Sequence, residues 1–503
     1  MKQRIKLLFA CSCVAAWSAG SLAQSFTWYA STEGNTWKTS TVKMSKKAAD
    51  AHVTVEENVA PIVEFKAWGA TFNELDWDAL GMLTRDEQDE ILKNVFSPEG
   101  DLRISRGRIS MNANDYARSW YSCDEVAGDL ELRYFNIDRD KQSIIPFIRA
   151  AQKYNPELTF WTSPWCPPSW MKITGDYPVL SSKFNHMPEK MNYILYGNVN
   201  DKVDPDEMKL VGRRGDKFPR QLATTDYFIQ DPRYLQAYAN YFCKFIDAYK
   251  EQGVNIDMVI YQNEAYSYTP YPGCAWTAEG TVRFNRDYLG PTLRQKHPEV
   301  KLYLGTFNTN RVDYVQKIAS DTKLQEYVSG MAFQWEGRES LPVLRKEHPE
   351  WNYMCSESEC GRGSFDWGAG EHTFELMNHY LGNGCNEYTF WNFILADNGE
   401  SPWGWKQNAI IRVDSKARTF TYTPEYFAVK HYSHFITKGS QVVAYKAQGD
   451  DRMPVLVSRT PEGKYVVVAG NFKDEASPLV VKIGEKSLSA ELAAHSYNTF
   501  VMK

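Results

Sequence analysis

Asp257-Met-Val-Ile-Tyr-Gln-Asn-Glu264 joins the pattern of a buried strand directly to a polar end, and this combination indicates the fold class. Residues Met258 to Tyr261 form a short apolar run, typical of a strand buried on both faces of a parallel sheet. Polar groups at the carboxyl end of such a strand are where an α/β barrel keeps its chemistry. A single glutamate at a strand end, such as Glu264, is more often a structural ion-pair partner than a catalytic residue. A second carboxylate nearby would favour the catalytic role.

A second acidic strand end follows downstream. The short run from Asn352 to Cys355 ends in Ser356-Glu357-Ser358-Glu359. If the fold brings both ends together, one carboxylic acid can protonate a leaving oxygen while one carboxylate attacks an anomeric carbon. A retaining glycosidase works in this way, with its carboxyl groups ~5–5.5 Å apart. Alternation along a strand places Glu357 and Glu359 on the same side, so spacing does not choose between them.

From about residue 60, apolar runs alternate with helical patterns, which indicates βαβ units and a parallel sheet. We therefore predict an α/β fold with a (β/α)8 TIM barrel over residues 61–424. The eight runs that close it are Val63–Ala70, Leu102–Ser110, Leu158–Ser163, Met258–Gln262, Leu302–Phe307, Gly330–Gln334, Tyr353–Ser356 and Tyr388–Trp391.

Helix and loop signals fit this alternation. Thr84-Arg-Asp-Glu87 predicts a capping box, and Asp231-Pro232 predicts an N-cap followed by a first-turn proline. The region Ile173–Asp226 is polar and has no clean period. Because it follows the third strand, we predict a long loop on the catalytic face, which closes one end of the cleft and favours exo action.

Both chain ends contain strand patterns. Residues 24–60 hold two short strands with no sheet of their own, and pairing them with C-terminal strands satisfies their backbone groups. We predict an additional all-β sandwich domain built from both chain ends, residues 24–60 and 425–503. Its C-terminal strands are Val442–Tyr445, Val455–Val457, Tyr465–Ala469, Leu479–Ile483 and Tyr497–Met502.

The first residues predict a secretory signal peptide over residues 1–23, with a basic start, an apolar stretch and small residues near position 23. No other segment is long and apolar enough to predict a membrane span. We expect the mature chain to be exported, to the periplasm, the cell surface or the medium.

Composition narrows the partners. Removing the predicted signal peptide takes the net charge from −5 to −8, and the chain has no basic block, which argues against nucleic acid. Aromatic residues make up 14% of the chain, with 16 Trp, which suits sugar stacking as well as a large core. Neither the Cys spacings nor the nine scattered His form a metal-ligand pattern, so we expect no metal and no cofactor.

With these motifs in place, the chain resembles glycoside hydrolase family 30, the family of lysosomal glucosylceramidase and of bacterial and fungal β-1,6-glucanases. The resemblance covers essentially the whole predicted mature chain. Its motifs come in order at the strand ends: Arg108-Ile-Ser-Met-Asn-Ala-Asn-Asp115-Tyr116, Thr162-Ser-Pro-Trp165-Cys-Pro-Pro-Ser-Trp170, Asn263-Glu264, Cys355-Ser-Glu357-Ser-Glu-Cys-Gly361, Trp391-Asn392 and Trp405-Lys-Gln-Asn408.

The resemblance implies that Glu264 is the acid/base and that Glu357, not Glu359, is the nucleophile. Asn263 is expected to hydrogen-bond the sugar 2-hydroxyl. Three strand-end Trp offer the flat, rigid surfaces on which a pyranose stacks. The predicted substrate-binding residues are Asp115, Trp165, Asn263, Trp335, Trp391 and Asn408.

Several features depart from the family pattern or have two interpretations. Glu359 stands where glucosylceramidase has a non-acidic residue, and Glu336 stands where it has an aromatic residue. The long insertion after strand three is a third departure from the family pattern. These three departures leave the identity of the substrate undecided, although not the reaction mechanism.

We expect Arg108 to be a buried partner of one catalytic carboxylate. Asn73 and Glu74 are either sugar contacts or structural pairs, and a turn-forming role is the alternative for Asn112 and Asp115.

We therefore predict an exported, retaining β-glycoside hydrolase that cleaves β-linked glucose in a β-1,6-glucan, a glucosylceramide-like lipid or a related glucoside. One alternative keeps the mechanism and changes the sugar, as in a β-xylosidase or a β-fucosidase. Another is a non-catalytic sugar-binding protein, which predicts the loss of one carboxylate, whereas both are present.

Overall fold

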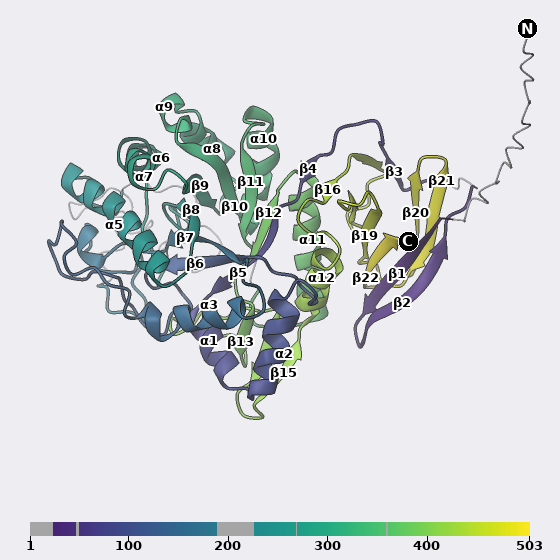
Figure 1. The fold of residues 1–503 in the computed structure, drawn as a ribbon, viewed down its shortest axis with the longest axis horizontal. Helices are drawn as coiled ribbons and strands as arrows, with labels where there is room; N and C mark the ends of the chain where they lie inside the picture. The colour runs from purple at the N-terminus through teal and green to yellow at the C-terminus, as the bar shows by residue number, and fades with distance from the viewer. Residues whose placement is uncertain (1–23, 47–49, 189–225, 268, 359–360) are drawn as a thin grey trace, which may run out of the picture.

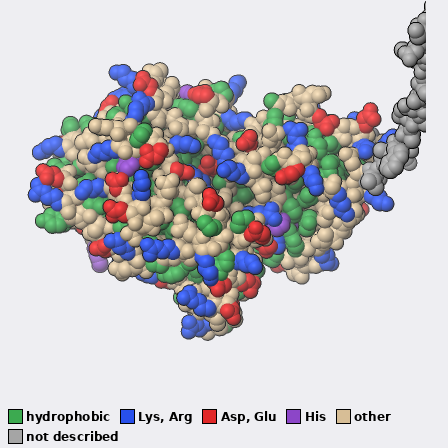
Figure 2. All heavy atoms as spheres, in the orientation of Figure 1, with side chains coloured by type: hydrophobic (Ala, Val, Ile, Leu, Met, Phe, Trp, Pro, Cys, Tyr) green, Lys and Arg blue, Asp and Glu red, His purple; other side chains and the backbone are tan. Residues whose placement is uncertain are grey.

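The structure is a computed structural model that describes residues 24–46, 50–188, 226–267, 269–358 and 361–503. Figure 1 shows a barrel ringed by helices and a β-rich domain beside it, with α11 (Trp367–Gly382) and α12 (Pro424–Ser433) between them. The predicted signal peptide and Glu359 lie outside the described residues. On the face seen in Figure 2, charged side chains of both signs are interspersed.

Eight parallel strands close the barrel in the order β10-β11-β12-β5-β6-β7-β8-β9. Each predicted apolar run overlaps one of these strands, so the predicted (β/α)8 barrel is confirmed. The runs are almost continuously apolar because helices cover the outer face of the sheet and side chains fill its interior. The strands are β5 (Ala67–Phe72), β6 (Arg106–Met111), β7 (Thr159–Pro164), β8 (Ile256–Ile260), β9 (Lys301–Phe307), β10 (Val328–Gln334), β11 (Asn352–Glu357) and β12 (Glu387–Phe390).

The first predicted run contains two strands rather than one. β4 (Val63–Glu64) pairs antiparallel with β16 (Gln441–Val442) in the β-domain, and only β5 belongs to the barrel. Between them, the Phe65 N–H donates to the Ser440 carbonyl (2.7 Å) and the Lys66 N–H to the Asn386 carbonyl (2.8 Å). The backbone thus changes sheets while the apolar pattern continues, so the pattern could not reveal the change.

The predicted helix starts are confirmed. Thr84 and Glu87 exchange both bonds of a capping box at α2, and Asp231 accepts from the Arg233 N–H at the start of α5. The helices are α1 (Glu74–Gly81), α2 (Arg85–Phe96), α3 (Ile144–Gln152), α5 (Pro232–Glu251), α6 (Ala278–Phe284), α7 (Gly290–Lys296), α8 (Val312–Ala319), α9 (Thr322–Gln325), α10 (Ser340–Glu347), α11 and α12. The 3-10 helices are η1 (Asp140–Gln142), η2 (Ser169–Met171) and η5 (Trp335–Glu339), and the π-helical segment η4 (Asn285–Leu289) joins α6 to α7.

The β-domain contains two sheets that share one apolar core. The larger has the order β2-β1-β22-β19-β18-β16-β4 and the smaller β17-β3-β20-β21. As predicted, the chain ends meet, because β1 pairs antiparallel with β22. Inward residues of both sheets, such as Val467 and Leu488, pack in the same core. The strands are β1 (Ser25–Thr32), β2 (Asn35–Lys43), β3 (Val53–Val55), β17 (Tyr445–Ala447), β18 (Val455–Arg459), β19 (Tyr465–Asn471), β20 (Ser477–Ile483), β21 (Lys486–Leu492) and β22 (Ser496–Met502).

Sequence reasoning missed β2, β21 and a small three-stranded sheet after β12. That sheet comprises β13 (Ile394–Ala396), β14 (Ile411–Asp414) and β15 (Thr419–Tyr422). β2 and β21 are polar on one face, so their apolar signal is weak. None of the helices in the described residues is both long and apolar enough to span a bilayer.

Candidate active site

A buried arginine joins the two acidic strand ends. Arg108, on β6, donates from Nη1 to Glu357 Oε2 (2.5 Å) and from Nη2 to Asn263 Oδ1 (2.7 Å). Its side chain is fully buried, and Glu357 is the last residue of β11. Asn263 and Glu264 lie just beyond the carboxyl end of β8, after Tyr261 and Gln262. The expectation that Arg108 holds a carboxylate is confirmed, and the carboxylate is that of Glu357.

Neutral side chains fix the orientation of Asn263. Its Oδ1 lies 2.7 Å from Gln334 Nε2 and 3.0 Å from Thr306 Oγ1, in addition to the bond from Arg108. Gln334 Nε2 also lies 3.2 Å from Glu357 Oε2. With Oδ1 occupied by these donors, the Asn263 Nδ2 group makes no hydrogen bond within the described residues. It is therefore the end of the amide that can donate to a ligand.

Glu264 has a left-handed backbone conformation, with φ of 47°, which is uncommon for a residue other than glycine. Its N–H donates to Thr306 Oγ1 (3.3 Å), and its Oε1 accepts from Asn308 Nδ2 (3.0 Å). The Glu336 N–H donates to Asn308 Oδ1 (2.8 Å), which fixes the direction of that amide. A non-glycine residue held in this conformation by its neighbours is typical of functional sites.

Sequence reasoning missed Thr306, Asn308 and Gln334 as members of this network. Gln334 ends one predicted run, and Asn308 comes just after the run that ends at Phe307. The signal that identified Glu264, a polar residue at the carboxyl end of a buried strand, applies equally to Gln334 and Asn308.

Three carboxyl groups influence one another electrostatically in this site. Burial raises the pKa of Glu357 to about 7, while Arg108 opposes this shift and the charge of Glu264 adds to it. Burial also raises the pKa of Asp115 well above its usual value, and the charges of Glu357 and Glu264 add to that shift. Asp115 Oδ1 is buried and has no hydrogen-bond partner among the described residues.

Two of the predicted stacking residues lie together beside Arg108. The rings of Trp165 and Trp391 stack with centroids 4.7 Å apart and planes inclined by 25°. The Arg108 guanidinium carbon lies 4.2 Å from the centroid of Trp165 and 5.2 Å from that of Trp391. The structure thus brings Asp115, Trp165 and Trp391 to the same barrel end as the two glutamates.

The other two predicted sugar contacts have different surroundings. Trp335 begins η5 and is partly buried against the barrel core. The Asn408 amide donates to Glu425 Oε1 (2.5 Å) and accepts from the Gly363 N–H (2.7 Å), so it holds the loop that follows β11. Sugar contact by Trp335 and Asn408 stays a prediction.

The open alternatives for Asn73, Glu74 and Asn112 are resolved by their partners. Glu74 accepts from Arg139 (2.8 Å), and Asn73 accepts from Asn114 (2.7 Å). Asn112 accepts from the Cys123 N–H (3.0 Å) and has a φ of 69°. These side chains therefore hold the loops after β5 and β6.

Aromatic side chains from several loops meet around the described start of the long insertion, residues 173–188. Tyr177 stacks on Trp120 (5.1 Å, 14°) and lies edge-on to Trp403 (6.2 Å). The buried Lys172 ammonium donates to the carbonyls of Tyr177 (2.9 Å) and Gly273 (2.7 Å). This segment is thereby tied to loops that follow β6, β8 and β12. Residues 189–225 lie outside the described residues.

Comparisons with known proteins agree with this geometry. The model of the glycosyl hydrolase family 30 TIM-barrel domain matches residues 65–183 and 228–436. The lysosomal acid glucosylceramidase of Mus musculus is 26% identical, over 82% of this chain and 77% of the relative. An endo-1,6-beta-D-glucanase of Neurospora crassa is 22% identical, over 81% and 78%. The structure of SrfJ from Salmonella typhimurium superposes with a TM-score of 0.80 at 18% identity, covering 95% of this chain and 99% of that one.

Proposed function

The chain belongs to glycosyl hydrolase family 30, and from this premise we propose that it is a retaining β-glycoside hydrolase with Glu357 as nucleophile and Glu264 as acid/base. The observation that carries the proposal is the bridge from Arg108 to Glu357 and Asn263, which ties both acidic strand ends to one guanidinium. Arg108 keeps one Glu357 oxygen occupied and favours its ionised form. The other oxygen can attack carbon.

The first step forms a bond between a Glu357 oxygen and the anomeric carbon as the bond to the leaving oxygen breaks. Glu264 gives its proton to that leaving oxygen. Asn308 donates to Oε1 of Glu264 and thereby orients the carboxyl group for this transfer. In the second step Glu264 takes a proton from water, the water oxygen bonds to the anomeric carbon, and Glu357 leaves as a carboxylate.

Asn263 and Asp115 are assigned to binding the sugar at the reacting position. The free Asn263 Nδ2 suits the 2-hydroxyl, whose hydrogen bonds strengthen at the transition state. The unpaired, buried Asp115 Oδ1 can accept a hydrogen bond from a sugar hydroxyl, which removes the cost of leaving that oxygen unsatisfied. The stacked pair Trp165–Trp391 supplies an apolar surface beside them.

β-Linked glucose is the proposed substrate. Two relatives, with 26% and 22% identity, are a lysosomal acid glucosylceramidase and an endo-1,6-beta-D-glucanase, and their names support glucose as the sugar. We further propose exo action on short glucosides, supported by the contacts of Tyr177 with Trp120 and Trp403. In this proposal residues 173–188, which these contacts hold in place, close one end of the substrate cleft. Export of the chain, directed by residues 1–23, completes the proposal.

The test uses a panel of aryl β-glycosides and β-1,6-glucan, with proton NMR of the first-formed sugar. We expect the aryl β-glucoside to be the best aryl substrate, with the β-anomer appearing first. An initial α-anomer contradicts double displacement. Preference for the β-xyloside or the β-fucoside contradicts the proposed glucose specificity but not the proposed mechanism. A ladder of internal fragments from β-1,6-glucan, with little early glucose, contradicts exo action.

A further inference from the structure

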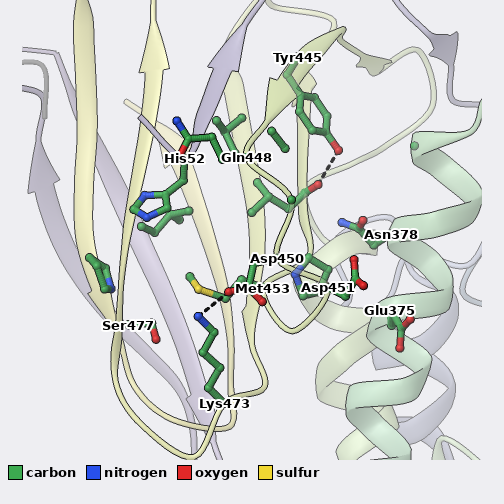
Figure 3. A pocket seen from close by; sticks show the side chains of 18 of the residues that line it. His52, Glu375, Asn378, Tyr445, Gln448, Asp450, Asp451, Met453, Lys473 and Ser477 are labelled. Carbon is green, nitrogen blue, oxygen red and sulfur yellow. Dashed lines mark hydrogen bonds and ion pairs between the residues drawn. The ribbon is translucent and has the colours of Figure 1, made fainter. Parts of the chain in front are cut away.

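A groove away from the barrel mouth lies between α11 and the β-domain, and it has a volume of about 720 Å³. Figure 3 shows Glu375 and Asn378 on α11 facing the segment that carries Tyr445, Asp450 and Asp451. Small-molecule sites typically occupy ~300–1,000 Å³ and are frequent at domain interfaces. The groove therefore has the size and the position of a binding site.

The floor of the groove is apolar and its rim is polar. Val53, Val455 and Leu479 line it and belong to the buried core of the β-domain. The rim consists mainly of carboxylates, amides and hydroxyls rather than cations. Its polar members include His52, Glu375, Asn378, Gln448, Asp451, Glu475 and Ser477.

Several rim groups are fixed and still have hydrogen-bonding capacity. The Tyr445 hydroxyl donates to the Val455 carbonyl (2.6 Å), which holds the ring against the groove. His52 Nδ1 accepts from the Val480 N–H (3.1 Å), so a neutral His52 has its proton on Nε2 and can donate there. Asn378, in contrast, interacts through its side-chain amide with the buried Tyr432 hydroxyl, which fixes it on the α11 side of the groove.

The charges on the rim restrict the ligand. Glu375, Asp451 and Glu475 are exposed carboxylates, and the single lysine of the groove, Lys473, is already paired with Asp450 (2.5 Å). An anion is therefore repelled. The carboxylates of the described residues form no group suited to a metal ion. A neutral molecule with many hydroxyl donors and an apolar face fits the carboxylates and amides of the rim and the apolar floor, and an oligosaccharide has these properties.

We propose that this groove is a second carbohydrate site, which binds a neutral gluco-oligosaccharide without cleaving it. The ligand class rests on the proposed function, because the glucan that is bound is the one that the barrel cleaves. Carboxylates and amides of the rim accept and donate hydroxyl hydrogen bonds, and the Tyr445 ring with the apolar floor contacts the sugar faces. Holding a polymer at two sites raises its effective concentration at the barrel mouth.

Isothermal titration of the full chain tests the proposal. Glu357→Gln is placed in every protein to prevent hydrolysis, and the ligand is a β-1,6-linked glucose trimer. We expect two binding events. Adding Gln448→Ala and Asp451→Ala should weaken one event by about fivefold or more and leave the other unchanged, since each lost hydrogen bond lowers affinity several-fold. The matched control replaces two exposed residues outside the groove, Gln295→Ala and Glu299→Ala.

Kinetics in the otherwise native chain separate this proposal from the proposed function. The two groove substitutions should lower kcat/KM for β-1,6-glucan and leave kcat/KM for an aryl glucoside unchanged. A single binding event, or equal affinities in the groove and control variants, overturns the second site whether or not the native enzyme hydrolyses glucosides. Failure to hydrolyse any β-glucoside overturns the proposed function instead, and binding at the groove is still decided by the titration.

Discussion

Two arginines on one strand face opposite ends of the barrel and have opposite electrostatic surroundings. Arg106 pairs with Asp257 (2.7 Å) and Glu387 (2.8 Å), and although burial lowers its pKa, these carboxylates outweigh burial and raise it. For Arg108, burial outweighs the nearby carboxylates and lowers the pKa. The Arg106 cluster lies toward the amino ends of the strands, where barrel residues serve stability.

The reactive carboxylate belongs to the cluster whose charges are less fully compensated. Arg106 has two carboxylate partners that it contacts directly, so this cluster is compensated. Of the carboxylates that act on it, Arg108 contacts Glu357 directly, while Glu264 and Asp115 act on it from a distance. The excess of carboxylates over cations at the carboxyl ends is part of what raises the pKa values of Glu357 and Asp115. Such an excess is typical of catalytic sites rather than of structural ion pairs.

The largest effect is expected when the carboxylate of Glu357 is removed. Glu357→Ala should lower kcat for an aryl β-glucoside by about 10⁴-fold or more, because the nucleophile is lost. Azide should restore part of the rate, since it fits the vacated space and can attack in place of the carboxylate. Steady-state rates with and without azide measure this. Glu359→Ala is the control, and rescue of that variant alone would assign the nucleophile two residues downstream.

Exchanging the two arginines for glutamine tests the comparison directly. Arg108→Gln should lower kcat/KM by about 10²–10³-fold, because Glu357 loses the charge that orients it and favours its ionised form. The thermal transition should be monitored in the same samples. Arg106→Gln is the matched substitution two residues away.

Arg106→Gln should act on stability instead. It leaves Asp257 and Glu387 without their cation, and because Asp257 is one-third exposed we expect a loss of about 3 kcal/mol, at the lower end for a buried pair. Denaturant unfolding measures it. The folded fraction of the Arg106→Gln variant should retain a near-native pH profile for kcat/KM. A displaced profile for Arg106→Gln, or an unchanged one for Arg108→Gln, contradicts the division between the two clusters.

The pH dependence of kcat/KM should show the titration of Glu357. Its pKa is raised to about 7, chiefly by burial, and the nucleophile acts as a carboxylate. The rate should therefore rise with pH up to that value and fall about tenfold for each unit below it. In Arg108→Gln this limb should move to higher pH, because the opposing influence is gone. A limb that stays near the ordinary glutamate pKa contradicts the role of burial.

The smallest effect is expected at the rim of the barrel mouth. Tyr177→Ala removes the ring between Trp120 and Trp403, which should open the end of the cleft that residues 173–188 close. We expect activity on long β-1,6-glucan to rise by a few-fold relative to an aryl glucoside. The product ladder and both values of kcat/KM report it. Phe184→Ala, which changes an exposed ring packed at Gly404, serves as the control.

Sequence patterns alone determined the architecture and the positions of the strand ends. The run from Met258 to Tyr261 and the polar residues after it place Glu264 at the carboxyl end of β8, because burial and the end of a strand are local properties. The capping box at Thr84 is equally local. The pattern also found the second acidic strand end, but the choice of Glu357 over Glu359 rested on family resemblance, since alternation left Glu359 as an equal alternative.

Only the tertiary structure determined which side chains contact and orient the catalytic residues. The bond from Arg108 to Glu357 spans 249 positions, and that from Asn308 to Glu264 spans 44, so neither follows from any periodicity. The roles of Gln334 and Thr306, and the groove between α11 and the β-domain, likewise exist only once the barrel has closed and the chain ends have paired. Local pattern determines each strand and where it ends, whereas closure of the barrel, a long-range property, determines the neighbours of each side chain.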